Sequence, residues 1–227
     1  MNDIFQWPPL ESDPEIFNNY LKSIGLPYNL YFDEIFSLDY HEIQEINHPV
    51  LGIIAALQRT SKERYFVKEN LKDEKFVDFY MKQTDKLDNA CGLIAALHVI
   101  GNNQDLIALQ ENSILERFYT NTREENPLQK ALYLENFQEF KEKHSKNANE
   151  GQSTHCTSQS QVKHHYSGFV LRDGNLVELD GRLDGPHLIK SNCNNLVDDT
   201  IEEVKLRLMK GAVSDKINLI YLYAKFD

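Results

Sequence analysis

Cys91 is the residue best suited to nucleophilic chemistry in this 227-residue sequence, because it lies where an Asp-Asn pair meets a long apolar run in QTDKLDNACGLIAALHVI. We expect a helix to begin here with Asp88 or Asn89 as its cap and the thiol in its first turn. Unpaired backbone N–H groups and the helix dipole favour a thiolate at that position. From position alone, however, Cys91 could equally be a small buried side chain, which is the commoner role of such a cysteine.

A cysteine nucleophile needs a nearby base, and His98 is the nearest histidine in sequence. Seven helical residues carry His98 about 10 Å along the axis, too far for a hydrogen bond to Cys91. We therefore predict that His98 lies in the core or on a helix face. The better candidates are His164 and His165, which precede a predicted hairpin.

The segment HHYSGFVLRDGNLVELDGR predicts a β-hairpin with Asp173-Gly174 as its two-residue turn. Counting outward from this turn makes His165 and Asp180 diagonal neighbours on one face, with Cα atoms roughly 7 to 8 Å apart. His164 then points to the other face, although a bulge would reverse this choice. The alternative is a polar edge pair with no catalytic purpose.

Together these residues could form a triad in which Cys91 attacks, His165 exchanges the proton and Asp180 orients the imidazole. Gln83 lies eight residues before Cys91 and could donate a side-chain N–H to an oxyanion. An exposed loop glutamine is its ordinary explanation. Cys156 beside His155 is a second thiol candidate, in a polar segment where an exposed side chain is the expected state.

Composition limits the other classes of function. The formal net charge of -11 disfavours nucleic acid as a partner and favours basic proteins or peptides. Apolar runs stay short of the roughly 18 residues of a membrane span, and the first residues lack the features of a secretory signal, so we expect a cytoplasmic protein. Three cysteines without a C-x-x-C spacing predict neither a disulfide scaffold nor a metal site, and no cofactor is expected.

Helical and strand-like segments alternate without an obvious linker, which predicts one α/β or α+β domain over residues 1–227. A capping box formed by Ser12 and Glu15 predicts a helix that stops at Gly25. Strands are expected at 28–36, 49–57 and 217–226, although 49–57 could also be a buried helical turn. Helices are expected at 127–144 and 200–210, and the polar segment 145–163 is the longest predicted loop.

The motifs taken together resemble the ubiquitin C-terminal hydrolase family of cysteine peptidases. The matching pieces are, in order, WPPLESDPE, KQT followed by NACGLIAALHVIGNN, ALYLENFQEF with the later EGQ, and GNLVELDGR. The resemblance covers about Trp7 to Ala224. It implies a papain-like fold with a central antiparallel sheet, helices on both sides and a knotted chain path. It also implies hydrolysis at the C-terminal Gly of ubiquitin through a cysteine thioester.

The same resemblance assigns the nucleophile to Cys91, the general acid/base to His165, its orienting partner to Asp180 and the oxyanion donor to Gln83. It places the active-site crossover loop of the family at residues 145–163. The positions that correspond to ubiquitin-facing regions are Leu10, Glu11, Glu150, Gly151, Gln152 and Asn218, the last of them before the final strand.

One departure from the family concerns Gln83. The family usually places this glutamine six residues before the nucleophile, whereas here the DKLD stretch adds two residues. If these residues bulge outward, Gln83 can still reach the site. If they shift the preceding backbone, its contribution is lost, and losing an oxyanion donor typically costs about 10² to 10³ in turnover.

We therefore expect a monomeric thiol hydrolase that acts on ubiquitin or a ubiquitin-like protein and favours small leaving groups or short peptides. A ubiquitin-binding protein with little turnover is one alternative, suggested by the altered spacing around Gln83. Another papain-like acyl transferase using the same triad is a second alternative.

Overall fold

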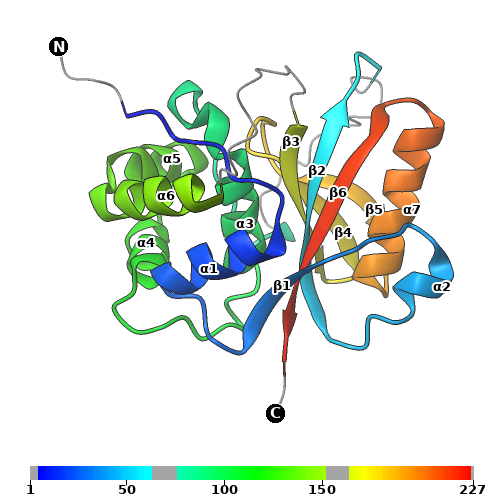
Figure 1. Cartoon of the computed structure of the whole chain (residues 1–227), viewed down its shortest axis with the longest axis horizontal. Coiled ribbons are helices and arrows are strands. Elements are labelled where there is room, and N and C mark those ends of the chain that lie inside the picture. Colours follow the sequence, from blue (N-terminus) through cyan, green and yellow to red (C-terminus); the bar gives the residue numbers. More distant parts are fainter. Residues whose placement is uncertain (1–4, 63–75, 152–163, 226–227) are drawn as a thin grey trace.

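A six-stranded antiparallel sheet forms the centre of the computed structural model, which describes residues 5–62, 76–151 and 164–225 (Figure 1). The strands lie in the order β1-β6-β2-β3-β4-β5, and neighbouring strands are antiparallel throughout. Their bounds are β1 (Leu30–Glu34), β2 (Val50–Arg59), β3 (His164–Arg172), β4 (Asn175–Leu179), β5 (His187–Ser191) and β6 (Val213–Ala224). The predicted central antiparallel sheet is confirmed, and the 49–57 run is a strand rather than a helical turn.

Helices cover both faces of this sheet, as predicted. One group consists of α1 (Pro14–Ile24), the 3₁₀ helix η3 (Asp85–Ala90), α3 (Cys91–Gly101), α4 (Ile114–Thr122), α5 (Pro127–Asn136) and α6 (Gln138–Gly151). In Figure 1, α7 (Leu196–Met209) and the short α2 (Tyr40–Ile43) lie on the other side of the sheet.

Strand β2 contributes side chains to the hydrophobic cores on both faces of the sheet. Ile54 and Ala56 pack with α1 and α3, whereas Ile53, Ala55 and Leu57 pack with α7. Side chains alternate between the faces of a strand, so a strand covered on both faces reads as a continuous apolar run. The apolar character of 49–57 therefore reflects its central place in the sheet.

The first helix begins one residue later than the capping box predicts. Its N-cap is Asp13, whose carboxylate accepts a hydrogen bond from the Glu15 amide at 2.7 Å. Ser12 instead donates to Asn218 Oδ1 at 2.6 Å and ties the segment before α1 to β6. The predicted stop at Gly25 is confirmed, and its φ of 122° is a conformation that glycine accommodates best.

The segment predicted as one helix over 127–144 is two helices, α5 and α6, separated by the extended residue Phe137. The predicted loop 145–163 is wrong for its first part, because α6 continues to Gly151. Phe140, His144, Asn147 and Ala148 are buried at helical spacing. Two of these four side chains are polar, which hides the stripe from a hydrophobicity pattern. Residues 152–163 lie outside the described part of the chain.

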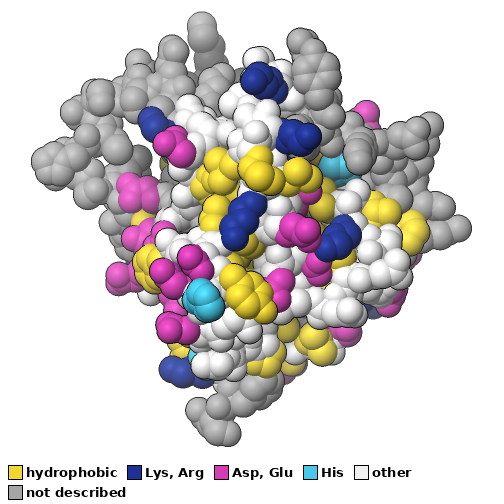
Figure 2. Space-filling view, turned by 90° about the vertical axis from the view of Figure 1, so that its right-hand side faces the viewer, with side chains coloured by type: hydrophobic (Ala, Val, Ile, Leu, Met, Phe, Trp, Pro, Cys, Tyr) yellow, Lys and Arg dark blue, Asp and Glu magenta, His cyan; other side chains and the backbone are white. Residues whose placement is uncertain are grey.

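The surface turned toward the viewer in Figure 2 carries acidic, basic and hydrophobic side chains intermixed. Within the described ranges, no helix is both long and apolar enough to cross a membrane.

Candidate active site

Cys91 is the first residue of α3 and lies at the edge of a cleft of about 740 Å³. The predicted cap is wrong: the N-cap is Ala90, without a side-chain hydrogen bond, because η3 runs directly into α3. The thiol therefore begins its helix as predicted, but no Asp or Asn side chain closes the helix end beside it.

His165 and Asp180 meet at one end of the β3–β4 hairpin. The register is the predicted one, with Arg172 opposite Asn175 and Gly168 opposite Leu179. Strand β4 ends at Leu179, so Asp180 follows the ladder, and its Oδ1 accepts a hydrogen bond from His165 Nε2 at 2.6 Å.

The two neighbouring histidines differ in burial and in position. His165 is buried and bonded to Asp180, whereas His164 is exposed and lines the cleft. The hairpin register thus brings together the predicted pair, and His164 stays outside it.

Asp180 is held at both carboxylate oxygens. Besides His165, the backbone N–H of Arg182 donates to Oδ1 at 2.9 Å, and Arg59 Nη1 lies 2.7 Å from Oδ2. Burial alone raises the pKa of Asp180, but the His165 hydrogen bond and the Arg59 charge outweigh it and lower the pKa to about 2. Asp180 therefore stays ionised at any physiological pH.

Burial disfavours the charged forms of both the imidazole and the thiol. Burial lowers the pKa of His165 despite the hydrogen bond that it donates to Asp180. Burial also raises the pKa of Cys91, against smaller opposing effects of the Tyr166 backbone and the Arg182 charge. The helix start alone had predicted a thiolate, so this expectation is wrong in direction: desolvation outweighs the helix end.

The second imidazole nitrogen of His165 is available for proton exchange. Nδ1 is buried and makes no hydrogen bond to the described residues, while Nε2 donates to Asp180. An unpartnered buried nitrogen is costly unless it has a task. Nδ1 can take a proton from a nucleophile while Asp180 steadies the ring.

Gln83 turns its amide toward the inserted DKLD stretch. Its Nε2 donates to the carbonyl of Asp88 at 2.8 Å and to that of Leu87 at 3.2 Å, both in η3. Its backbone N–H donates to Gly181 O at 2.8 Å, which ties Gln83 to the residue after Asp180. The extra residues thus form helical turns whose carbonyls occupy both amide protons of Gln83.

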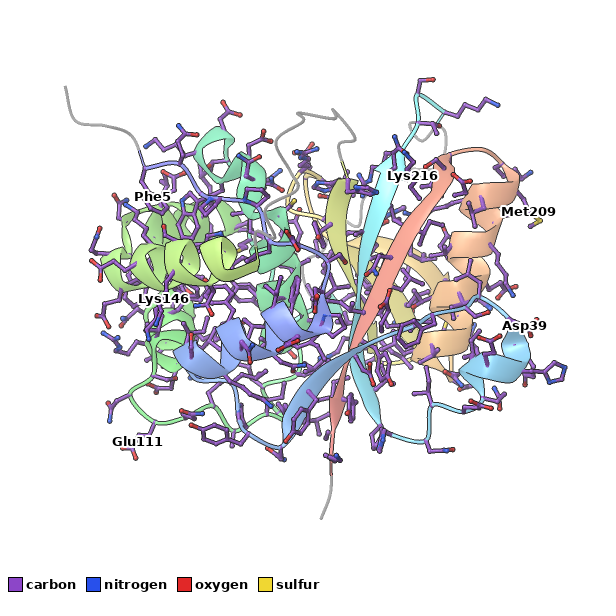
Figure 3. All side chains as sticks on the ribbon, viewed as in Figure 1. Phe5, Asp39, Glu111, Lys146, Met209 and Lys216 are labelled. Carbon is purple, nitrogen blue, oxygen red and sulfur yellow. The ribbon has the colours of Figure 1, made fainter. Side chains whose placement is uncertain are left out.

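Of the predicted substrate-facing residues, Leu10, Glu11 and Asn218 line the cleft. Lys216, which Figure 3 labels on β6, also lines it. Leu10 is buried, and its carbonyl accepts a hydrogen bond from Tyr166 Oη at 3.0 Å. Asn218 lies within β6 opposite Ala56, not before the last strand.

The three residues predicted to contact substrate from the crossover loop are not placed in a described loop. Glu150 and Gly151 belong to the end of α6 rather than to a loop. Gln152 lies outside the described residues, as do Cys156 and His155.

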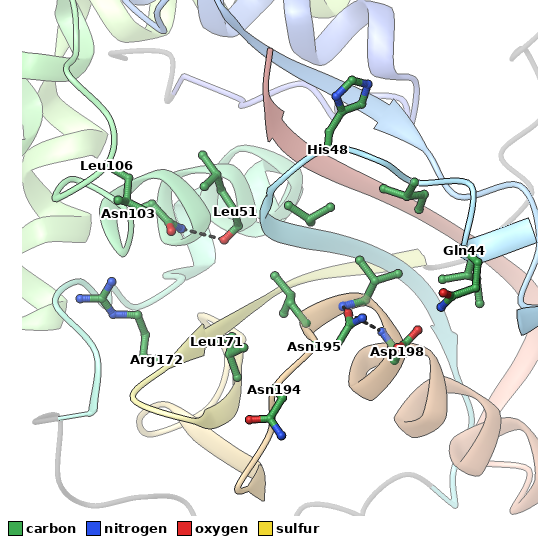
Figure 4. A pocket seen from close by; sticks show the side chains of 15 residues that line it. Gln44, His48, Leu51, Asn103, Leu106, Leu171, Arg172, Asn194, Asn195 and Asp198 are labelled. Carbon is green, nitrogen blue, oxygen red and sulfur yellow. Dashed lines mark hydrogen bonds between the residues drawn. The ribbon is translucent and has the colours of Figure 1, made fainter. Parts of the chain in front are cut away.

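A second pocket, of about 390 Å³, lies away from this chemistry (Figure 4). Its lining includes none of the predicted catalytic residues, and its polar groups bind one another: Asn103 donates to Leu51 O at 2.9 Å and Asn195 accepts from the Asp198 amide at 3.2 Å. The described ranges contain no group of His, Cys, Asp and Glu residues that could hold a metal ion. The cleft beside Cys91 is therefore the candidate active site.

Sequence reasoning missed the charged residues behind the triad. Arg59, Glu178 and Arg207 come from β2, β4 and α7, and they meet beneath Asp180. Each looks like an ordinary polar residue in the sequence. Only Glu178 could be noticed in the sequence. Because side chains alternate between the faces of a strand, Glu178 and Asp180 are expected on the same face.

A cysteine at the start of a helix and a buried His–Asp pair, on an α+β fold, are the features of a cysteine peptidase. The family described as "Ubiquitin carboxyl-terminal hydrolase, family 1" matches residues 7–210, and the chain belongs to this family.

Individual relatives agree with this assignment. Ubiquitin carboxyl-terminal hydrolase 3 of Arabidopsis thaliana is 32% identical over 223 residues, covering 95% of this chain and 93% of the relative. Isozyme L1 of Homo sapiens is 28% identical over 186 residues, covering 80% and 81%. The fold is similar to that of the Trichinella spiralis UCH37 catalytic domain bound to ubiquitin vinyl methyl ester, with a TM-score of 0.77 at 21% identity, covering 97% and 96%.

Proposed function

We propose that this chain, as one catalytic domain over residues 1–227, is a deubiquitinating thiol hydrolase that cleaves bonds at the C-terminal Gly of ubiquitin. The observation that carries the proposal is the pair of His165 and Asp180, held at 2.6 Å, while Cys91 lines a cleft with both neighbours of His165, namely His164 and Tyr166. Membership of the ubiquitin carboxyl-terminal hydrolase family supports ubiquitin as the substrate.

In this proposal Cys91 is the nucleophile. Its thiol gives its proton to Nδ1 of His165 as the sulfur attacks the carbonyl carbon of the terminal Gly. Because burial disfavours charge on both groups, this transfer is part of the attack. Asp180 keeps its charge, orients the ring and stabilises the imidazolium that forms.

The second half of the cycle uses the same residues. His165 returns the proton to the departing amine, thiol or peptide, which leaves ubiquitin attached to Cys91 as a thioester. Water, deprotonated by His165, then hydrolyses the thioester and restores the free thiol.

We assign the oxyanion donor to Gln83. Its amide protons point to the carbonyls of Leu87 and Asp88, so donation to an oxyanion requires one of these two bonds to open. The bond between the Gln83 amide and Gly181 holds the backbone during that change.

Small leaving groups and short peptides fit a cleft of about 740 Å³ that Leu10 and Tyr166 border. Hydrolysis of ubiquitin extended by a short peptide should therefore be faster than hydrolysis of a folded ubiquitin dimer. Equal rates on both would overturn this preference. A cytoplasmic location suits the reduced state of Cys91 and Cys193, and fractionation of cells would test it.

Turnover of ubiquitin C-terminal 7-amido-4-methylcoumarin tests the proposed function. The wild-type protein should release coumarin, and Cys91→Ala should bind ubiquitin without releasing it. Cys193→Ala is the matched control, because Cys193 is a buried thiol packed near α7 and outside the cleft. Binding without turnover in the wild type would instead identify a ubiquitin-binding protein.

A further inference from the structure

We propose that Arg59 is a positioning residue of the triad, which fixes the Asp180 carboxylate in the orientation that His165 needs. The proposal rests on the catalytic roles assigned above. Arg59 is the last residue of β2, two positions after Leu57, which pairs with His165 across the β2–β3 ladder. The strand that abuts His165 therefore also delivers the guanidinium to Asp180.

The two oxygens of Asp180 have different partners. Oδ1 accepts hydrogen bonds from His165 Nε2 at 2.6 Å and from the Arg182 backbone at 2.9 Å. Oδ2 is buried and accepts no aligned hydrogen bond among the described residues, but Arg59 Nη1 lies 2.7 Å from it in an ion pair. A carboxylate anchored at one oxygen alone can rotate about its bond to Cβ. The ion pair at the second oxygen opposes that rotation.

Arg59 is itself held by a buried carboxylate. Its Nη2 lies 3.3 Å from Oε1 of Glu178. Glu178 also receives two hydrogen bonds from Arg207 of α7, at 3.1 Å to Oε1 and 2.7 Å to Oε2, and one from Ser167 at 2.9 Å. Arg207 already neutralises the negative charge of Glu178. The positive charge of Arg59 can therefore stabilise the Asp180 carboxylate.

The result is a chain of alternating charges from α7 to the triad: Arg207, Glu178, Arg59, Asp180 and His165. All but Arg59 are almost completely buried, and the Arg59 side chain is 18% exposed. Buried charge pairs are screened little by salt and tolerate the loss of one member poorly. The chain therefore fixes the position of Asp180 relative to the sheet.

Arg59 also sets the proton chemistry of the site. Three charged groups act on His165: Asp180 and Arg182 after β4, and Arg59 from β2. Of these, Arg182 also acts on the Cys91 thiol. His98 of α3 and Glu178 of β4 face Asp180 from further away. The positive charge of Arg59 disfavours the imidazolium of His165, so its removal raises the pKa of that residue.

The experiment compares Arg59→Gln with Arg59→Lys, using kcat, KM and the pH profile of kcat/KM on the coumarin substrate. Arg59→Gln should lower kcat about 10- to 100-fold with little change in KM, because the orientation of the acid/base is lost. The limb of its pH profile that reports His165 should move upward by roughly half a unit to one unit. Arg59→Lys should restore that limb but only part of kcat, since an ammonium cannot hold Glu178 and Asp180 as a fork.

The matched control is Arg123→Gln, the same loss of one charge at an exposed position at the end of α4. It should keep the wild-type kcat and pH profile. A folded Arg59→Gln protein with wild-type kcat and limbs would overturn the proposal.

If the Arg59→Gln protein does not fold, the Arg59→Lys variant tests the positioning role of Arg59. A kcat at least threefold lower than wild type, with unchanged limbs, supports positioning, and a wild-type kcat overturns it. An NMR titration of His165 in either variant gives a second reading that needs no turnover. An inactive wild-type protein would count against the proposed function, whereas an active wild type indistinguishable from Arg59→Gln counts against Arg59 alone.

Discussion

Two buried histidines outside the triad should make the protein sensitive to mild acid. His98 and His144 are fully buried, and burial lowers the pKa of each from 6.5 to about 4. His98 lies between the Met81 backbone and Leu179 O, and His144 donates to Pro8 O at 2.7 Å. These backbone hydrogen bonds favour the charged rings, but burial outweighs them and keeps both histidines neutral.

The sign and size of the effect follow from linkage. Each folded-state pKa lies below the unfolded value, so the stability that each histidine contributes is present above pH 6.5 and lost as the pH falls toward 4. Between pH 7.5 and 4.5 each contributes a loss of about 2.5 kcal/mol in the free energy of unfolding, from 1.36 kcal/mol per pKa unit. Together they account for about 5 kcal/mol, comparable to the whole stability of many domains.

Urea denaturation at the two pH values measures this difference. His144→Gln should be less stable than wild type at pH 7.5, because packing against Trp7 and Tyr20 is lost. Its loss of stability between pH 7.5 and 4.5, however, should be smaller than the wild-type loss by about 2.5 kcal/mol. The carboxylates titrate alike in both proteins and cancel. An equal loss in variant and wild type would refute the assignment of acid sensitivity to His144.

Other substitutions test separate parts of the structure. Gln83→Ala should lower kcat about 10²- to 10³-fold in the coumarin assay, and a loss below tenfold would point to another oxyanion donor. Glu178→Gln leaves the buried Arg207 uncompensated, so urea denaturation should show a loss of about 3 to 5 kcal/mol; a near-neutral result would contradict the buried network. In Gly52→Ala the new Cβ would lie 2.3 Å from Val99 Cγ1, which should cost about 1 to 3 kcal/mol, and wild-type stability would show that β2 can move away from α3.

The hairpin was predictable because its information is local. Asp173-Gly174 defines the turn, and both residues have positive φ, as a two-residue turn of this kind requires. The side-chain period of two then assigns His165 rather than His164 to the face of Asp180. This assignment of His165 follows from the hairpin alone. The resemblance to the hydrolase family assigns the same histidine.

The other features depend on contacts between distant segments. Asp13 replaces Ser12 as the helix cap because Ser12 is drawn to Asn218, more than two hundred residues away. The meeting of Arg59, Glu178 and Asp180 requires the sheet to be assembled first. The raised pKa of Cys91 likewise follows from burial, which no local pattern reveals.

The identity of the nucleophile is tested most directly by covalent labelling with ubiquitin vinyl methyl ester. The wild-type protein should form one adduct, located at Cys91 by mass spectrometry, and Cys91→Ala should form none while still binding ubiquitin. An adduct that persists in Cys91→Ala, on Cys156 or Cys193, would contradict the assignment of the active site.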